Sequence, residues 1–385
     1  MQLHYFYSFD LSHLYVQLLK KQENRSMEGI VKGWIVALAV FIPILVVVAF
    51  FVPFQILSAE NKKQNVVGAD STPQLREILL LANEKNVKVA PDNYLYPGGL
   101  WYGAMTFNGT IPGPLIVANQ GDMLRITLKN EGNSVHSLNF HAGSGPSQAL
   151  SGVVKPGESR TWTMRVDNPG AFLYHCDGDN LNGIWEHIAD GMYGGMVVRS
   201  RENEPIKNEF YVAFSELYDT SAPSPFTANA PHLNTSAQIG SFDMNKFISK
   251  RPDLVLTNGM AFKYIPWIGT EAKIRLNSDA QTFHVKAGEL TRWYIFNAGP
   301  RDSISFNFGA GVIKEITYGD NGSNAGNSVT MSNGKGTNRI DEIVNIPPGS
   351  GSLIEVTFPE PGVYFGNDHD VESILKGAGF VVLAD

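Results

Sequence analysis

The two halves of the chain repeat the same turn motifs, and this internal repeat limits the fold more strongly than any other sequence feature. The motifs are rich in glycine, proline and asparagine, which are typical of turns, and they keep the same order in both halves. The matched pairs are residues 129–132 with 296–299, residues 155–158 with 347–350, and residues 169–174 with 361–366. Both halves also end in an apolar run after a Gly-rich turn. The repeat therefore predicts two domains with the same elements in the same order.

Short apolar segments separated by turns favour an all-β fold. The sequence holds 38 glycines and few stretches of helical period, as expected for a sheet protein with many turns. In the first half the segments recur at the spacing of a β-sandwich. They cover residues 115–119, 123–130, 137–141, 159–167, 171–175 and 195–199. We therefore predict two β-sandwich domains, over residues 87–200 and 208–385, with a charged boundary between them.

The segment before the first sandwich is expected to be a linker with one short helix, over residues 58–86. Its beginning is polar, whereas residues 74–84 carry apolar side chains at a helical period. Such a helix would pack against the first sandwich through its apolar face.

A long apolar segment lies further towards the N-terminus. No charged residue occurs between Gly33 and Ala59, and about 20 such residues are enough to span a bilayer. Basic residues are more frequent before the segment than after it, which favours a cytoplasmic N-terminus. We therefore expect residues 1–32 in the cytoplasm, a transmembrane anchor over residues 33–57, and the remaining chain in an extracytoplasmic space. The alternative is a signal peptide cleaved near Ala59, which would give a secreted protein.

The net charge bears on nucleic-acid binding, and the cysteine content bears on disulfide bonds. The net charge is −7 and the basic residues are scattered, so no nucleic-acid partner is expected. The chain has one cysteine, Cys176, which rules out an internal disulfide. The importance of Cys176 must therefore lie in its chemistry.

Cys176 stands in a stretch that is rich in metal-binding residue types. His175 precedes it directly, and His187 and Met192 follow at a short distance. One thiolate, two imidazoles and a thioether are the ligands of a blue-copper electron-transfer site. Trp185, two residues before His187, would be either a core aromatic or a docking surface for an electron donor.

His136 and His141 supply further imidazoles, and their spacing sorts the ligands into two sets. The two histidines are five residues apart, so on one strand they face opposite sides of the sheet. His175 and Cys176 are adjacent and also face opposite sides. We therefore pair His136 with Cys176, and His141 with His175. The first set is completed by His187 and Met192.

The second set needs a third ligand, and the repeat suggests where it lies. Seven residues after the start of the Pro-Gly turn, the first half has Cys176 and the second half has Asp368. The second domain therefore lacks a thiolate of its own, and His369 follows this position directly. A site of three histidines with an open position suits copper or zinc that binds a small molecule.

Taken together, the H-x₄-H, His-Cys, H-x₄-Met and late Asp-His elements resemble the copper nitrite reductase family, which is grouped with the multicopper oxidases. The resemblance covers roughly residues 90–385, and the loop at residues 181–187 is most similar to archaeal members. It implies two Greek-key cupredoxin β-sandwiches with type 1 and type 2 copper. It also implies a homotrimer in which His369 reaches the type 2 site of a neighbour. The implied type 1 ligands are His136, Cys176, His187 and Met192, and the implied type 2 ligands are His141, His175 and His369.

Two positions depart from the family pattern. The catalytic aspartate of the family stands three residues after the first histidine of H-x₄-H, where this chain has Asn139. The catalytic histidine stands in a Ser-Phe-His segment, where this chain has Asn307. Asparagine forms hydrogen bonds but cannot act as a general acid or base. Reduction of nitrite to nitric oxide consumes two protons, so the resemblance predicts weak nitrite turnover.

The resemblance implies a copper-dependent oxidoreductase that moves electrons between type 1 and type 2 copper and acts on hydroxylamine, nitric oxide or nitrite. The expected electron partner is a small electron-transfer protein such as a cupredoxin. Two alternatives stay open: a dissimilatory nitrite reductase that forms nitric oxide, and a cupredoxin electron carrier with a vestigial type 2 site. The sequence has no His-x-His motif, which argues against a laccase-type oxidase.

Overall fold

Strands form most of the part of the chain that the computed structural model describes. This part covers residues 72–93, 95–143, 152–179, 183–201, 208–220, 239–268, 275–309, 312–319 and 343–385. The prediction of a mostly β protein is confirmed. The predicted cytoplasmic segment 1–32 and the predicted anchor 33–57 lie outside the described residues. Among the residues that are described, no helix has the length and apolar character needed to cross a membrane.

The first domain consists of two sheets that enclose one core. The outer sheet has the order β10-β2-β1-β4-β6, and the inner sheet has the order β3-β8-β7-β5. Alternate side chains of β4 are buried, as expected for a strand with one face on a core. The strands are β1 (Leu75–Ala90), β2 (Leu100–Phe107), β3 (Ile116–Asn119), β4 (Met123–Asn130), β5 (Asn139–Phe140), β6 (Ser159–Arg165), β7 (Gly170–His175), β8 (Tyr193–Arg199) and β10 (Ile239–Gly240).

The second domain likewise has two main sheets, and here each sheet has five strands. Their orders are β11-β9-β15-β19-β17 and β14-β21-β20-β16-β18, and β12 pairs with β13 in a separate hairpin. The core is built around the fully buried Trp293, which stacks on Phe210 and Phe380. The strands are β9 (Glu209–Leu217), β11 (Leu254–Thr257), β12 (Trp267–Ile268), β13 (Arg275–Leu276), β14 (Thr282–Val285), β15 (Leu290–Gly299), β16 (Ile304–Phe308), β17 (Val312–Gly319), β18 (Val344–Ile346), β19 (Ser350–Thr357), β20 (Gly362–Asp368) and β21 (Phe380–Ala384).

The repeated turn motifs form the same hydrogen bonds in both domains. In the first, the Asn130 side-chain amide donates to the Val154 carbonyl at 2.9 Å, and its oxygen accepts from the glycine two residues later. In the second, the Asn297 amide donates to the Ile346 carbonyl at 2.9 Å, and its oxygen likewise accepts from the glycine two residues later. The matching asparagines therefore have the same structural role in both sandwiches. Each links the end of one strand to a neighbouring segment through side-chain hydrogen bonds.

β1 corrects the prediction of a short helix at residues 74–84. The segment is a strand that runs parallel to β4 as far as Ala82 and then antiparallel to β2. Its run Ile78–Ala82 is almost continuously apolar, and such a short run fits a strand as well as a helix. Pairing with two strands satisfies its backbone and buries Leu80 and Ala82, so tertiary pairing overrides local helical preference. The last part of the predicted linker therefore belongs to the first domain's outer sheet.

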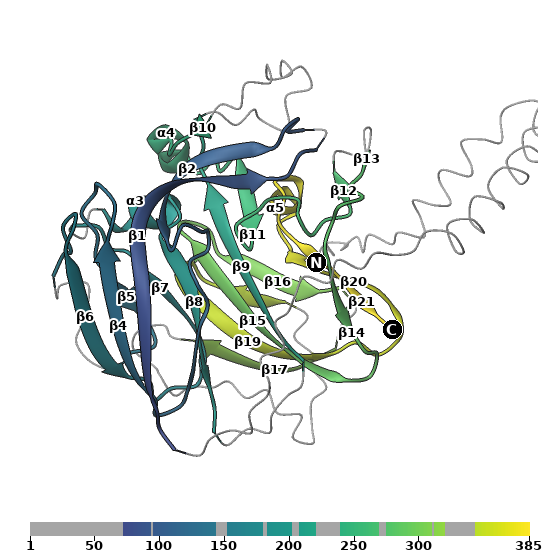
Figure 1. The fold of residues 1–385 in the computed structure, drawn as a ribbon. Coiled ribbons are helices and arrows are strands. Elements are labelled where there is room, and N and C mark those ends of the chain that lie inside the picture. The colour runs from purple at the N-terminus through teal and green to yellow at the C-terminus, as the bar shows by residue number, and fades with distance from the viewer. Residues whose placement is uncertain are drawn as a thin grey trace, which may run out of the picture. The chain divides into compact units, whose positions relative to one another are not determined.

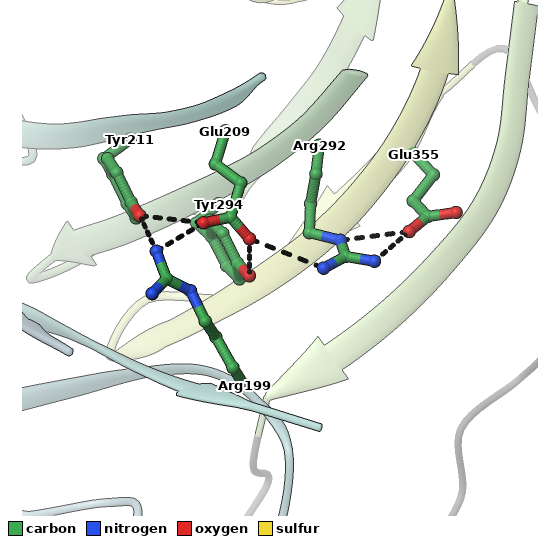
Figure 2. Close-up of polar contacts among 6 residues, drawn as sticks. All are labelled: Arg199, Glu209, Tyr211, Arg292, Tyr294 and Glu355. Atoms are coloured by element: carbon green, nitrogen blue, oxygen red, sulfur yellow. Dashed lines mark hydrogen bonds and ion pairs between the residues drawn. The ribbon is translucent and has the colours of Figure 1, made fainter. Parts of the chain in front are cut away.

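The two sandwiches meet through the inner sheet of the first domain, which lies beside the sheet of β9, β15 and β19 (Figure 1). At the end of β8, Arg199 pairs with Glu209 of β9 at 2.5 Å. Glu209 also accepts a hydrogen bond from Tyr294 of β15, and Arg292 pairs with Glu355 of β19 at 2.6 Å (Figure 2). The cations and carboxylates alternate, so each charge in this partly buried row has an opposite neighbour. These ion pairs hold the second domain against β8, the strand that carries Arg199.

Three short helices are described. They are α3 (Ile184–Ala189), α4 (Met244–Ile248) and α5 (Val371–Leu375). α3 follows β7 and carries one of the predicted ligands, His187. α5 follows β20 at the equivalent place in the second domain, again as the repeat predicts.

Candidate metal centres

β7 is buried on both faces, and its alternation separates Cys176 from His175. Tyr174 and Cys176 belong to the core of the first sandwich, whereas Leu173 belongs to the cluster shared with the second domain. Neighbouring strand residues point to opposite faces, so His175 follows Leu173 towards the second domain. The two adjacent side chains therefore lie on opposite faces of the strand, as the sequence predicts.

On the Cys176 side, the structure brings three predicted ligands together. The Sγ atom of Cys176 lies 3.3 Å from Nδ1 of His187 and 3.7 Å from Nδ1 of His136. All three ligand atoms lie within 4.8 Å of one another. A trigonal metal with bonds of about 2.0–2.3 Å would hold its ligands roughly 3.5–4 Å apart. The donor set and its spacing therefore fit a single metal ion.

The backbone fixes these ligands before any metal binds. His136 exchanges two backbone hydrogen bonds with Val154. The His187 amide donates to the Gly183 carbonyl at the start of α3, at 3.1 Å. Met192 is fully buried, donates to the His187 carbonyl and accepts from the Cys176 amide. Met192 is thus tied by its backbone to two of the three ligands, as an axial ligand would require.

The pKa values of these groups suit metal binding. Burial raises the pKa of Cys176 to about 11, and the amides of Ser137 and Gly178, which donate to its sulfur, partly oppose that rise. Burial, and then the neighbouring His187, lowers the pKa of His136 to about 4. Burial also lowers the pKa of His187. Both imidazoles are therefore neutral donors near pH 7, whereas the thiol keeps its proton until a metal displaces it.

Asp368 occupies the place of Cys176 in the second domain. Its carboxylate accepts from the backbone amides of Ser305 and Asp370, at 2.9 and 3.2 Å. Cys176 accepts from the equivalent amides of Ser137 and Gly178, at 3.3 and 3.2 Å. The counterpart that the repeat predicts is confirmed, and a carboxylate has replaced the thiolate at this position.

On the other face of β7, His141 and His175 form a second candidate site. Their Nε2 atoms lie 2.9 Å apart, and the rings are nearly perpendicular, at 84°. Two imidazoles bound to one metal at about 2.0–2.1 Å have nitrogens roughly 2.9–3.4 Å apart. Burial, and then His175, lowers the pKa of His141 to about 4, so this ring is also neutral. The pair fits two ligands of one metal ion.

His369 does not join this pair within one chain. It is exposed after the end of β20, where its amide donates to the Ser305 carbonyl. Across the described ranges, the one group of three His, Cys, Asp or Glu ligand atoms within mutual reach is that of His136, Cys176 and His187. A third ligand for His141 and His175 would therefore have to come from outside this part of the chain.

Asn139 lies beside the histidine pair, and the register shows why. In the antiparallel pairing of β5 with β7, Asn139 is directly opposite His175. Directly opposed residues share a face of the sheet with Cβ atoms about 4.5–5.5 Å apart. Asn307 holds the equivalent place in the second domain, opposite Asn367 of β20. Both asparagines are partly exposed.

Comparisons with known proteins agree with this geometry. Residues 88–203 match the sequence model of the family described as Multicopper oxidase. The copper-containing nitrite reductases of Neisseria meningitidis serogroup A and of Neisseria gonorrhoeae are each 28% identical over 285 residues, which is 73% of this chain. The match covers 64% and 62% of those proteins, so the chain spans less than two thirds of their length. The solved structure of the copper nitrite reductase from Nitrosomonas europaea is 25% identical with a TM-score of 0.63, over 81% of this chain and 94% of that one.

This chain is similar in sequence and fold to copper nitrite reductases, and part of it matches the multicopper oxidase family. The family match of residues 88–203 covers the three-ligand group and the His141–His175 pair. The structural match covers most of the chain, including the second sandwich. A copper nitrite reductase from Thermus scotoductus, 23% identical with a TM-score of 0.60, shows the same fold.

Sequence reasoning missed two buried acidic residues close in sequence to the candidate ligands. Asp177 is 2% exposed, and its Oδ1 atom lies 3.1 Å from Nδ1 of His175. Asp190, at the end of α3, accepts a hydrogen bond from Tyr102 at 2.5 Å, and burial raises its pKa to about 6. For Asp177 the only sequence signal is its place directly after the His-Cys pair. Asp190 and Tyr102 are 88 residues apart, and no local pattern links them.

Trp185, for which the sequence leaves two roles open, packs against the second domain. Its ring stacks on Phe247 of α4 at 4.8 Å and contacts Phe242. Arg301 lies over the same Phe247 ring, 4.9 Å from its centroid. Trp185 is partly exposed, but it is a packing residue that joins the ligand-bearing helix to the second domain.

Proposed function

We propose that this chain is a copper-dependent oxidoreductase that acts on a small inorganic nitrogen species. The observation that carries the proposal is the group of one thiol sulfur and two imidazole nitrogens within 4.8 Å, with the His141–His175 pair on the opposite face of the same strand. The first group would hold type 1 copper with Met192, and the pair would hold type 2 copper with His369 of a neighbouring copy. Copper would supply single-electron chemistry at both places.

The chain itself links the two sites. Cys176 and His175 are consecutive, so one peptide unit and two side chains connect the sulfur to the Nε2 atom that faces His141. Ser137 adds a polar contact, because its amide donates to the sulfur at 3.3 Å while its hydroxyl accepts from the Asp177 amide at 3.1 Å. These contacts hold the connection in one geometry, which is what transfer between two fixed sites requires.

Asparagine at the substrate side would decide which reactions are efficient. Asn139, opposite His175, can donate a hydrogen bond to a bound oxyanion and can accept one, but it cannot deliver a proton. A positioned acid or base contributes about 10²–10⁴-fold to a rate. We therefore expect nitrite to be a poor substrate, and hydroxylamine or nitric oxide, or the oxidative direction, to be favoured.

The proposed assembly has three further parts. His369 is exposed and could meet the His141–His175 pair of another copy in a homotrimer. A small electron-transfer protein, such as a cupredoxin, would exchange electrons with the three-ligand group. An anchor or signal at residues 33–57 would place the enzyme outside the cytoplasm.

Turnover assays with nitrite, nitric oxide and hydroxylamine test the proposal. Asn139→Asp combined with Asn307→His should raise nitrite turnover by at least about 10²-fold, because it restores proton-transfer groups. Asn133→Asp adds a comparable charge at an exposed turn and should leave turnover unchanged. Wild-type nitrite turnover of about 1–10³ s⁻¹ would instead favour an ordinary nitrite reductase. A single copper per chain would favour the electron carrier.

A further inference from the structure

Asp177 is a buried carboxylate with no ordinary hydrogen-bond partner. It is 2% exposed, and across the described residues neither carboxylate oxygen accepts a hydrogen bond of good geometry. A carboxylate removed from water without compensation is strongly destabilising. Buried polar atoms of this kind are rare, and each one calls for an explanation.

Among the described residues, the one charged or polar side chain that contacts the carboxylate is the ring of His175. Nδ1 of His175 lies 3.1 Å from Oδ1 of Asp177 and 3.3 Å from the Cys176 carbonyl oxygen. The opposite ring nitrogen, Nε2, faces Nε2 of His141 at 2.9 Å. Two acceptors therefore surround Nδ1, which favours the tautomer with the proton on Nδ1 and the free lone pair on Nε2. That lone pair points to the place where a metal would bind.

The backbone of Asp177 is held by the residue that also holds the thiolate. The Asp177 amide donates to the Ser137 hydroxyl at 3.1 Å, and the Ser137 amide donates to the Cys176 sulfur at 3.3 Å. These bonds fix the backbone of residue 177 relative to both candidate sites, and any residue at this position would form them. The carboxylate itself is explained only by its contact with His175, because an apolar side chain would fill the same space at lower cost.

We propose that Asp177 is a positioning carboxylate for the metal ligand His175. The inference rests on the proposed function, because it requires a metal at the His141–His175 pair. With its Oδ1 atom 3.1 Å from Nδ1, Asp177 would accept the Nδ1 proton once a metal holds the ring, and would thereby orient the ring, fix its tautomer and make Nε2 a stronger donor, as carboxylates behind metal-bound histidines do. Asp177 lies behind the ring, on the side away from His141, so it cannot reach a substrate at the metal. It is therefore not a replacement for the proton donors that Asn139 and Asn307 lack.

Copper binding to the full chain tests this role. Wild type, Asp177→Ala and Asp177→Asn are loaded with Cu²⁺, and the affinity of the second copper is measured by chelator competition, together with its electron paramagnetic resonance signal. Loss of a partner behind a metal-bound histidine lowers metal affinity about 10–100-fold, so this is the effect expected for Asp177→Ala. Asp177→Asn keeps an oxygen that can accept the Nδ1 proton, so its loss should be smaller. Asp179→Asn removes the same charge two residues later and should leave the second copper unchanged.

The type 1 copper reports whether each variant is folded. If both variants keep the intense visible band, and affinity for the second copper falls about 10–100-fold in Asp177→Ala and less in Asp177→Asn, the positioning role is supported. If Asp177→Ala binds the second copper as tightly as wild type, with the same resonance signal, the inference is overturned. The same holds if both variants lose the two coppers together, because the role is then structural. A wild-type chain with one copper overturns the proposed function itself, and this inference with it.

Discussion

Binding of one metal ion to the His136–Cys176–His187 group should release one proton at pH 7. The pKa of Cys176 is raised to about 11, so the thiol is protonated before the metal binds and must lose that proton. The pKa of His136 is lowered to about 4, and that of His187 is also lowered, so neither imidazole has a proton to release. One proton is thus exchanged, and metal affinity should rise about tenfold for each pH unit between pH 6 and 8.

The number of protons released on metal binding can be measured with Zn²⁺, which does not oxidise the thiol. Titration calorimetry in buffers of different ionisation enthalpy gives the number of protons released, and Cys176→Ala shows which part of the signal belongs to this site. Measurement at pH 6 distinguishes lowered histidine pKa values from ordinary ones most clearly. Ligands with ordinary pKa values of about 6.5 for histidine and 8.5 for cysteine would release roughly 2.5 protons there. A value near one supports the buried, neutral histidines, whereas a value near 2.5, or near zero, refutes the reasoning.

Two further predictions concern assembly and stability. His369→Ala should lower occupancy of the second copper while the visible band stays intact, as measured by copper analysis and absorption; a monomer that holds both coppers would contradict the shared site. Arg292→Met should destabilise the chain by about 3–5 kcal/mol in denaturant unfolding, because it leaves the partly buried Glu355 without its cation. The exposed pair Arg125–Glu77 is the control, and its loss should cost about 0–1 kcal/mol. Similar costs for the two pairs would show that burial of the row in Figure 2 does not matter.

The group of His136, Cys176 and His187 could be predicted from sequence because the chemistry of a thiolate metal site restricts the residue types strongly. A single cysteine leaves no choice of thiolate, and period-two alternation then separates Cys176 from His175 and His136 from His141. The structure places each on the expected side. The repeat also identified Asp368 correctly, because equivalent turns must satisfy equivalent backbone amides.

Other features could not be read from the sequence, for physical reasons. The sequence predicts a helix where β1 lies because such a short apolar run fits either element, and the two strands that pair with it lie outside the segment. The role of Asp177 depends on burial, which a single acidic residue after a cysteine does not reveal. His369 could be proposed only from the repeat and the resemblance, because no contact within the described part of one chain brings it to His141.

Counting copper in the purified chain tests the central claim most directly. The account predicts two copper ions per chain, of which one gives an intense visible band and the other a type 2 resonance signal. Cys176→Ala should abolish the band and leave the second copper in place, because Cys176 is the only thiolate in the chain. Colour that survives in Cys176→Ala, or a wild-type chain that binds a single copper, would contradict the account.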